Sequence, residues 1–198
     1  MAELDLSGNA WDSRYKSNDI GWDLGVVSPP LKEYIDQLKD QDKDKSILIP
    51  GGGNSYEAEY LFQKGFQNVF VVDVSQTALE NLQQRVPVFP KDHLILGNFF
   101  DVNRQFDLVL EQTFFCAIHP SLREKYAKKM HQLLNPHGKL VGVLFKVPLF
   151  SNRPPFGGSK KEYVNYFESK FHFETFESCY NSHPSRQGKE LFINFTKK

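Results

Sequence analysis

From residue 45 onward, short runs of β-branched and aliphatic residues alternate with longer amphipathic stretches. This alternation is typical of βαβ units, in which helices cover both faces of a parallel sheet. Within the run 68–73, residues 69–72 are all apolar, as expected for a strand that is buried on both faces. The predicted strands are 46–50, 68–73, 93–96, 106–110 and 139–145, and the predicted helices between them are 55–64, 75–82 and 121–134.

The pattern changes after residue 145. A loop that contains Pro, Phe and Gly (147–158) precedes a predicted helix at 159–169 and two predicted strands at 173–178 and 190–195. A hairpin-like pair of strands at the end of a parallel sheet predicts the α/β class, with a mixed sheet of roughly seven strands and helices on both faces. The first 45 residues are predicted to hold one helix, at about 30–39. The aromatic segment 11–29 cannot form a core alone, so we expect it to fold over another part of the molecule.

The size and charge of the chain limit its function. A length of 198 residues predicts one domain, 1–198. Lys plus Arg and Asp plus Glu number 24 each, so no net charge favours a nucleic acid or an anionic membrane as partner. The sequence has no apolar run of membrane-spanning length and no features of a signal peptide, which predicts a cytoplasmic protein. Cys116 and Cys179 lack the spacing of a disulfide scaffold, and the six His form no metal-type motif, so no metal is predicted.

The first candidate ligand site follows the strand 46–50. Ligands of open α/β sheets bind beyond the carboxyl ends of the strands. There, Gly51–Gly53 lets a ligand approach the backbone, and Tyr56 replaces the third glycine of a dinucleotide-binding turn, which favours a ligand without a pyrophosphate. Asp73 ends the next strand, 22 residues after Gly51, where a carboxylate can accept hydrogen bonds from both ribose hydroxyls. Together, the glycine turn and Asp73 predict nucleoside binding. The alternatives are that the glycine turn is only a tight connection between strand and helix, and that the carboxylate of Asp73 only caps the next helix.

Two more segments follow strands at the same sheet edge. Asn98, in the segment 97–100, offers an amide beside aromatic rings, which suits an adenine base, although Phe99 or Phe100 can equally be core residues. The segment 111–116 lies where a cofactor and a substrate would meet. Its Cys116 is interpreted as a buried, inert thiol, since no His is placed to activate it by sequence.

Several of these segments resemble the thiopurine S-methyltransferase superfamily, and most closely its thiol and halide or thiocyanate methyltransferase branch. The resemblance is carried by Ile-Pro-Gly-Gly-Gly at 49–53, by Val-Asp-Val-Ser at 72–75 and by 113–123, of which Phe-Phe-Cys-Ala is the most specific part. Trp11, Tyr15 and Trp22-Asp23-Leu24-Gly25 match the aromatic lead-in of that branch, and Arg186-Gln187-Gly188-Lys189-Glu190 matches its tail. The resemblance therefore covers nearly the whole chain.

What the resemblance implies is a class I methyltransferase with a Rossmann-like fold, in which residues 1–45 form a lid and a helix and residues 46–198 form the core. The cofactor would be S-adenosylmethionine, with S-adenosylhomocysteine as product. The family often has Asp at the position of Asn98 and Cys at that of Gly52. Carried over position by position, the residues implied to line the cofactor are Trp11, Tyr15, Trp22, Gly51, Asp73, Asn98, Phe99, Glu111 and Gln112.

The same resemblance implies a small-molecule acceptor, a thiol or another soft sulfur or halide nucleophile, methylated by direct in-line transfer. Such nucleophiles need no strong general base, and the sequence offers no obvious one. We expect three aromatic side chains around the acceptor, and one of two arginines to draw an anion inward, although packing and solvated charge explain these residues equally well. These candidates are Phe114, Phe115, Phe156, Arg14 and Arg153.

The loop 147–158 also bears on which acceptor the chain can methylate. Pro154-Pro155-Phe156 superficially resembles the motif of nucleic-acid amino-methyltransferases, but it follows the wrong strand and comes after Arg153. The plant-type halide and thiol enzymes carry Gly-Gly-Pro-Pro-Tyr there, so this chain lacks their tyrosine hydroxyl.

Three alternatives stay open at this point. The acceptor can be an oxygen or nitrogen nucleophile, the chain can bind the cofactor without catalysis, or it can be a nicotinamide oxidoreductase, which the missing third glycine disfavours. A monomer is expected, with a dimer as the alternative.

Overall fold

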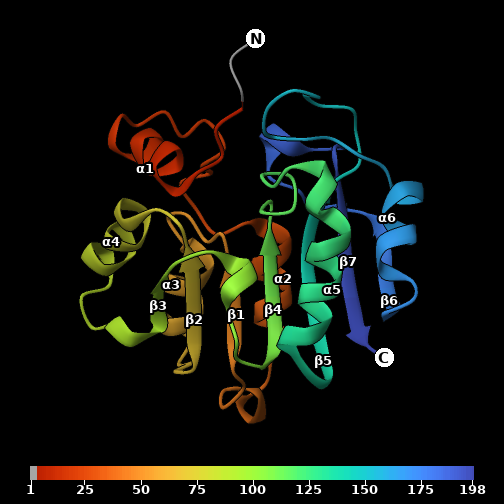
Figure 1. Cartoon of the computed structure of the whole chain (residues 1–198). Helices are drawn as coiled ribbons and strands as arrows, with labels where there is room; N and C mark the ends of the chain where they lie inside the picture. Colours follow the sequence, from red (N-terminus) through yellow and green to blue (C-terminus); the bar gives the residue numbers. More distant parts are fainter. Residues whose placement is uncertain (1–3) are drawn as a thin grey trace.

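The computed structural model describes residues 4–198, so the first three residues of the predicted ranges 1–45 and 1–198 lie outside the described residues. Seven strands form one mixed sheet in the order β3-β2-β1-β4-β5-β7-β6 (Figure 1). The first five are mutually parallel, and β7 is antiparallel to both of its neighbours. The predicted α/β class with a mixed seven-stranded sheet is therefore confirmed.

The elements follow the predicted alternation closely. The strands are β1 (Ile47–Pro50), β2 (Val69–Asp73), β3 (Leu94–Leu96), β4 (Phe106–Gln112), β5 (Leu134–Phe145), β6 (Phe171–Ser178) and β7 (Glu190–Lys197). The α-helices are α1 (Gly8–Lys16), α2 (Pro29–Asp36), α3 (Tyr56–Gln63), α4 (Gln76–Arg85), α5 (Arg123–Leu133) and α6 (Lys160–Phe167). Short 3-10 helices are η1 (Asp40–Asp42), η2 (Lys91–His93), η3 (Phe99–Asp101), η4 (Pro120–Leu122) and η5 (Pro184–Arg186).

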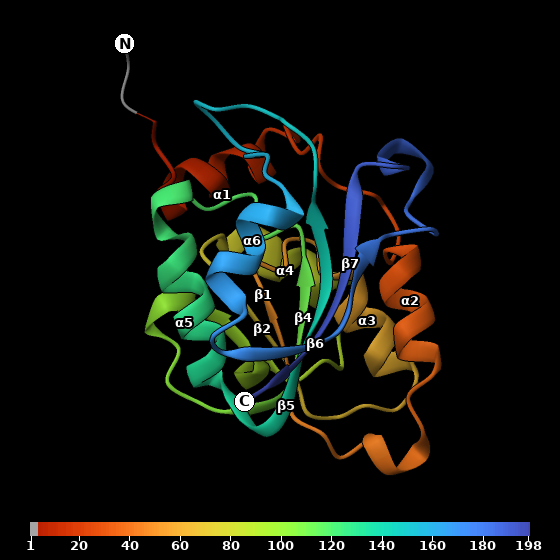
Figure 2. The ribbon, with the colours of Figure 1, turned by 90° about the vertical axis from the view of Figure 1, so that its right-hand side faces the viewer.

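Helices cover both faces of the sheet (Figure 2). One hydrophobic cluster lies under α5 and α6, and a second lies under α2, α3 and α4. Successive residues of a strand point to opposite faces, so Leu48 belongs to the first cluster while Ile47 and Ile49 belong to the second. This explains why β1 and residues 69–72 of β2 are apolar throughout.

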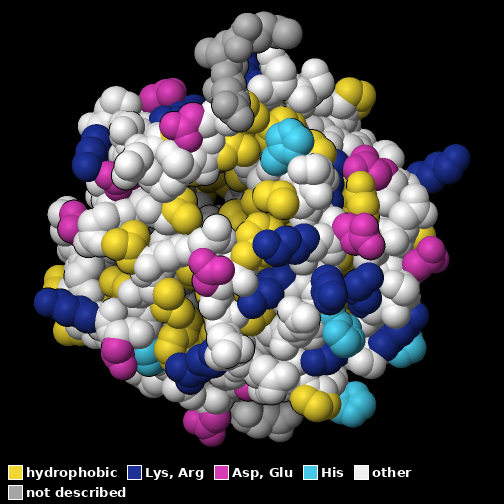
Figure 3. Space-filling model, viewed as in Figure 1, with side chains coloured by type: hydrophobic (Ala, Val, Ile, Leu, Met, Phe, Trp, Pro, Cys, Tyr) yellow, Lys and Arg dark blue, Asp and Glu magenta, His cyan; other side chains and the backbone are white. Residues whose placement is uncertain are grey.

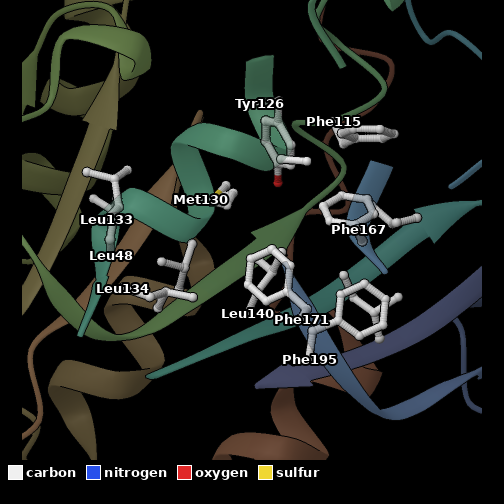
Figure 4. Packing of buried hydrophobic residues seen from close by; sticks show 14 of the residues in the cluster. Leu48, Phe115, Tyr126, Met130, Leu133, Leu134, Leu140, Phe167, Phe171 and Phe195 are labelled. Carbon is white, nitrogen blue, oxygen red and sulfur yellow. The ribbon is translucent and has the colours of Figure 1, made fainter. Parts of the chain in front are cut away.

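The cluster under α5 and α6 is rich in aromatic rings. Figure 4 shows Tyr126 and Met130 projecting from α5 beside Phe115 and Phe167. The rings of Phe115 and Tyr126 meet edge to face with centroids 4.9 Å apart. Eight of the 18 phenylalanines of the chain are buried in this cluster.

Two features of the fold differ from prediction. The amino-terminal region holds two α-helices, because α1 precedes α2. No residue of α1 is buried, so its sequence carries no apolar face from which a helix could be recognised. In addition, β5 begins at Leu134, five residues earlier than predicted, because Leu134 pairs with Phe106 before the register shifts.

Within residues 4–198, none of the helices is both long and apolar enough to cross a lipid bilayer.

Candidate active site

A cavity of about 920 Å³ lies at the carboxyl ends of β1, β2 and β4, where the strand order reverses. The segment 7–26, which we call the cover segment, contains α1 and lies beyond these strand ends (Figure 1). The space-filling view has a hollow bordered largely by hydrophobic side chains on this side of the molecule (Figure 3). The sequence-predicted residues that line the cavity are Trp11, Arg14, Tyr15, Trp22, Gly51, Asp73, Asn98, Phe99, Gln112, Phe114 and Arg153.

The glycine turn after β1 brings the backbone to the cavity surface. Gly51 and Gly53 have φ of +55° and +53°, a left-handed conformation that side chains rarely adopt. A Cβ at Gly51 would overlap the ring of Phe114, and one at Gly53 would lie 2.5 Å from the hydroxyl of Tyr15. The turn conformation therefore favours glycine at both positions, and at Gly51 the Phe114 ring also excludes a side chain.

Asp73 ends β2 beside this turn. Its side chain accepts hydrogen bonds from the backbone N–H groups of Gly53 and Ser75, each at 2.8 Å. Burial raises the pKa of Asp73, and these hydrogen bonds oppose the rise. The carboxylate thus ties the glycine turn to the start of α4, and because a carboxylate has about four acceptor positions, it can still receive hydroxyl groups from a ligand.

Asn98 and Phe99 lie after β3. The Asn98 side chain accepts a hydrogen bond of 2.9 Å from the N–H of Phe100 and so caps η3. Phe99 is buried and contacts the ring of Phe114 with centroids 5.3 Å apart. Both residues line the cavity, and Phe99 also has the core position that the sequence leaves open.

The segment 111–116, which we call the floor loop, directs its side chains in two directions. Thr113 has a φ of 58°, unusual for a β-branched residue, so the alternation of the strand is broken there. Phe114 points to the cavity, whereas Phe115 packs in the core with an exposed fraction of 1 %. The expectation that Phe115 surrounds the acceptor is therefore corrected.

Glu111 is also directed away from the cavity. It is fully buried and accepts hydrogen bonds from the hydroxyl of Tyr126 and, at 3.0 Å, from the N–H of Phe115. Burial raises the pKa of Glu111 to about 7, against the lowering effect of these two donors. The structure thus makes Glu111 a support of the floor loop rather than a cavity-lining residue, while its neighbour Gln112 does line the cavity.

Phe156 is likewise a core residue and does not line the cavity. Its exposed fraction is 1 %, and its backbone N–H donates to the carbonyl of Cys116 at 2.7 Å. The neighbouring residues Pro154 and Pro155 line the cavity in its place. Cys116 is buried as expected, and burial raises the pKa of its thiol to about 12.

The cover segment faces the cavity with aromatic rings. Trp22 packs edge to face on Trp11 and Tyr15, with centroid distances of 5.3 and 5.8 Å. The guanidinium of Arg14 lies 4.2 Å from the centre of the Trp22 ring. These rings and this cation form one wall of the cavity.

Polar contacts attach the cover segment to the rest of the molecule. Asp12 accepts hydrogen bonds of 2.8 Å from the hydroxyl of Ser75 and the N–H of Thr77, at the start of α4. Arg186 donates to the carbonyl of Trp22 at 2.6 Å. No residue of α1 is buried, so these polar contacts carry much of the attachment.

Several cavity-lining residues were not predicted from the sequence. Three are apolar and three can donate hydrogen bonds: Ile118, Leu122, Phe145, His119, His183 and Arg186. One signal was available, since the tripeptide His-Pro-Ser occurs at 119–121 and again at 183–185.

Among residues 4–198, no group of three or more His, Cys, Asp or Glu side chains could hold a metal ion.

Comparisons with known proteins agree with this architecture. The model of the thiopurine S-methyltransferase family matches residues 6–197. The chain is 28% identical over 162 residues to the probable thiol methyltransferase 2 of Arabidopsis thaliana, covering 79% of this chain and 70% of that protein. It is 27% identical over 190 residues to the thiocyanate methyltransferase 1 of the same plant, covering 91% and 81%. It is also 27% identical over 190 residues to the thiopurine S-methyltransferase of Vibrio parahaemolyticus, covering 82% and 87%.

Among solved structures, the chain resembles the Burkholderia thailandensis 1,6-didemethyltoxoflavin-N1-methyltransferase with bound 1,6-didemethyltoxoflavin and S-adenosylhomocysteine. The TM-score is 0.74 at 16% identity, and the match covers 100% of this chain and 93% of that one. At this identity the likeness concerns the fold.

Proposed function

Because the chain belongs to the thiopurine S-methyltransferase family and is an S-adenosylmethionine-dependent methyltransferase, we propose that it methylates a small thiol or another soft sulfur or halide nucleophile. One observation carries the proposal: a nucleoside-type site at the glycine turn and Asp73 shares one cavity with an apolar wall that includes Phe114 and Ile118. Soft nucleophiles are weakly hydrated, so an apolar wall costs them little in lost hydration. The sulfur acceptors in the names of the relatives support the same choice.

The residues of the cavity fit the cofactor. We propose that Asp73 receives the ribose hydroxyls, that Asn98 and Phe99 hold the adenine, and that the glycine turn accommodates the amino-acid end. The side-chain oxygen of Gln112 supports this fit, since it is buried without a hydrogen-bond partner in residues 4–198 and lines the cavity. The wall of Trp11, Tyr15 and Trp22 would cover the bound cofactor.

In this proposal residues 4–45 act as a lid and a supporting helix over one domain. The cover segment reaches α4 through Asp12 and reaches the carboxyl-terminal part of the chain through Arg186. Contacts with both halves of the chain support a single domain. They also support a lid that is attached at more than one point.

The chemistry asks little of acid or base groups. Bound S-adenosylmethionine supplies an activated methyl group, and the protein has to orient the nucleophile and exclude water. The wall of Phe114 and the rings of the cover segment would exclude water. The thiol of Cys116 stays protonated because burial raises its pKa to about 12, so it does not compete for the methyl group.

The experiment that tests this function has two steps. First, the midpoint of thermal unfolding is measured with S-adenosylmethionine, S-adenosylhomocysteine and NAD, because a ligand that binds only the folded state raises the midpoint. We expect both adenosyl ligands to raise it and NAD to leave it unchanged. Asp73→Asn should lower the affinity for the adenosyl ligands about tenfold or more and so reduce the rise that they produce. An NAD response without an adenosyl response would contradict the proposal.

In the second step, methyl transfer is followed with panels of thiols, thiocyanate, iodide, phenols and amines. Transfer to thiols or the two anions is the expected result. Transfer only to phenols or amines would show an oxygen or nitrogen acceptor instead. Binding of the adenosyl ligands without transfer to any member would point to a cofactor-binding protein without catalysis.

A further inference from the structure

A buried ion pair lies where the cover segment meets the carboxyl-terminal part of the chain. The side chain of Arg186, at the end of η5, is 9 % exposed, and that of Glu190, at the start of β7, is 1 % exposed. Nη1 of Arg186 lies 3.5 Å from the Glu190 carboxylate, and Nη2 donates to the carbonyl of Trp22 at 2.6 Å. One side chain therefore joins the first residues of β7 to the segment that covers the cavity.

The turn that carries Arg186 is fixed on both sides. The N–H of Arg186 donates to the carbonyl of His183 at 2.7 Å, and the carbonyl of Arg186 accepts from the N–H of Lys189 at 3.0 Å. Gly188 has a φ of +76°, a conformation that glycine adopts easily. The guanidinium also lies 5.6 Å from the centre of the Phe145 ring, at the end of β5. A cation held by its backbone, by a carboxylate and by a ring is a firm point of attachment for a cover.

A second buried carboxyl adds to the need for this cation. Glu57, in the first turn of α3, is buried and accepts a hydrogen bond of 2.8 Å from the N–H of Ser28, shortly after the cover segment. Burial raises the pKa of Glu57, whereas this hydrogen bond and the charge of Arg186 lower it. Arg186 thus offsets the charge of two buried carboxyls while it holds the Trp22 carbonyl.

The indole of Trp22 packs within the cover segment itself. It meets the rings of Trp11 and Tyr15 edge to face, donates from Nε1 to the Tyr15 hydroxyl at 3.3 Å, and lies under the guanidinium of Arg14. Contacts of this kind make the aromatic wall one unit, but they do not fix where that unit lies over the cavity.

Two contacts attach this end of the cover to other elements. The carboxylate of Asp23 accepts from the side chain of Asn54, which is half-buried in the turn after β1. The second contact is the hydrogen bond from Arg186 to the Trp22 carbonyl, and it comes from a buried, charged donor. Hydrogen bonds from a charged donor are roughly twice as strong as those between neutral groups.

We propose that Arg186 is a positioning residue, which holds the carbonyl of Trp22 and so fixes the wall of Trp11, Tyr15 and Trp22 over the cofactor. The inference rests on the proposed placement of the cofactor beneath that wall. Arg186 and Trp22 are 164 residues apart in the chain, so the carboxyl-terminal turn orders the amino-terminal cover. Because this order exists before the cofactor arrives, less has to be created on binding.

The tryptophans of the chain provide a direct readout. The sequence has two, Trp11 and Trp22, and both belong to the cover segment. Tryptophan emission therefore reports on the cover and not on the core. An indole that moves from a packed environment into water emits at longer wavelengths and is quenched more readily by acrylamide.

Matched variants separate positioning from a general effect on stability. Arg186→Met alone leaves the Glu190 carboxyl buried without its cation, which destabilises the fold whatever else Arg186 does. With Glu190→Met added, two apolar side chains replace the ion pair, a change that is often neutral for stability. The informative comparison is therefore Arg186→Met/Glu190→Met against Glu190→Met alone, in which Arg186 keeps the Trp22 carbonyl. Lys189→Gln removes the exposed cation of the same turn and should match wild type.

We expect the double variant to bind S-adenosylhomocysteine about tenfold more weakly than Glu190→Met does in calorimetry, as for one hydrogen bond from a charged group. Without ligand, its emission should lie at longer wavelengths and its quenching by acrylamide should increase. Its urea midpoint, followed by circular dichroism, should stay close to that of Glu190→Met. If the double variant does not fold, folded Arg186→Met and wild type give the same comparison of emission.

The emission keeps this test separate from the proposed cofactor site. If wild type did not bind S-adenosylhomocysteine, the placement of the cofactor would be wrong, and the emission without ligand would still test the hold of Arg186 on the cover.

Two results would overturn the inference. Emission and affinity that are the same with and without Arg186 would show that other contacts hold the cover in place. A loss of affinity with unchanged emission would show that Arg186, which lines the cavity, contacts the cofactor itself and does not act through the cover.

Discussion

The floor loop and the cover segment face each other across the cavity, yet different contacts hold them. Under the floor loop, the side chains of Glu111 and Phe115 are buried in the aromatic cluster beneath α5 and α6. The cover segment, whose helix α1 has no buried residue, is attached through Asp12 and the carbonyl of Trp22. Burial of apolar area contributes far more free energy than exposed polar contacts do. Changes in the floor should therefore alter stability, and changes in the cover should alter cofactor affinity.

The two left-handed glycines of one turn give the largest test of this difference. A methyl group at Gly51 meets Phe114, which cannot retreat because its ring packs against Phe99 and Tyr126. Left-handed strain and overpacking together should make Gly51→Ala about 3–4 kcal/mol less stable. At Gly53 the methyl group meets only the hydroxyl of Tyr15, and the cover segment can move away. Gly53→Ala should lose only about 1 kcal/mol of stability.

Urea unfolding of both variants measures these losses, and calorimetry with S-adenosylhomocysteine measures affinity. Gly53→Ala should weaken the binding of S-adenosylhomocysteine by more free energy than the variant loses in stability. Equal losses of stability in the two variants would mean that the cover is as firmly packed as the floor.

The buried carboxyl of Glu111 predicts that the free energy of unfolding depends on pH, with a change similar in size to the effect of Gly51→Ala. Burial raises the pKa of Glu111 from 4.5 to about 7, so the folded state binds this proton more tightly than the unfolded state. The stabilising contribution of the protonated form is complete below about pH 4.5 and is lost as the pH rises through 7. Glu111→Gln cannot titrate, so between these values wild type should lose about 3 kcal/mol relative to this variant.

The difference in unfolding free energy between wild type and Glu111→Gln, measured from pH 4.5 to 8, isolates this group from all others that titrate. Tyr126→Phe is the matched control, because the Tyr126 hydroxyl lowers the pKa of Glu111. In this variant the loss of stability should continue to a higher pH than in wild type, because the pKa of Glu111 is higher without the hydroxyl. Parallel curves for wild type and Glu111→Gln would show that the carboxyl does not titrate in this range.

The same contrast explains what the sequence could reveal. The strands and their helices were predictable because burial on both sheet faces imposes continuous apolar runs, as in β2. The glycine turn and Asp73 were predictable because strand ends converge at one edge. The helix α1 was not predictable, because a helix without a buried face has no periodic pattern of apolar residues.

Within the floor loop the sequence could not show which aromatic ring turns inward. The left-handed Thr113 resets the alternation, so Phe114 faces the cavity and Phe115 the core. The resemblance implies a cofactor-lining role for Glu111, whereas its contacts with the Tyr126 hydroxyl and the N–H of Phe115 show it as a support. That His119 and His183 line the same cavity depends on tertiary structure, although the repeated tripeptide is visible in the chain.

The smallest effect is expected where the cover segment meets α4. Asp12 accepts from the hydroxyl of Ser75 and the N–H of Thr77, like the carboxylate of a helix cap, and removal of such a cap typically costs about 1 kcal/mol. If the cover must close over the cofactor, Asp12→Ala should weaken S-adenosylhomocysteine binding about fivefold in calorimetry. The unfolding midpoint without ligand should hardly change, because the cost falls on attachment of the cover and not on unfolding of the core.

Two controls make this last test specific to the attachment. Lys16→Gln removes the exposed partner of Asp12, and an exposed ion pair contributes little, so affinity should stay the same. Asp12→Asn keeps an oxygen for the donors of α4 and should retain most of the affinity. Hydrogen bonds from Lys16 and Thr77 hold the pKa of Asp12 well below its ordinary value, so the difference between wild type and Asp12→Ala should persist to about pH 4 and fade only in stronger acid. If Asp12→Ala instead lowered stability as strongly as Gly51→Ala, the cover would be part of the folded core, and the contrast between the two walls would fail.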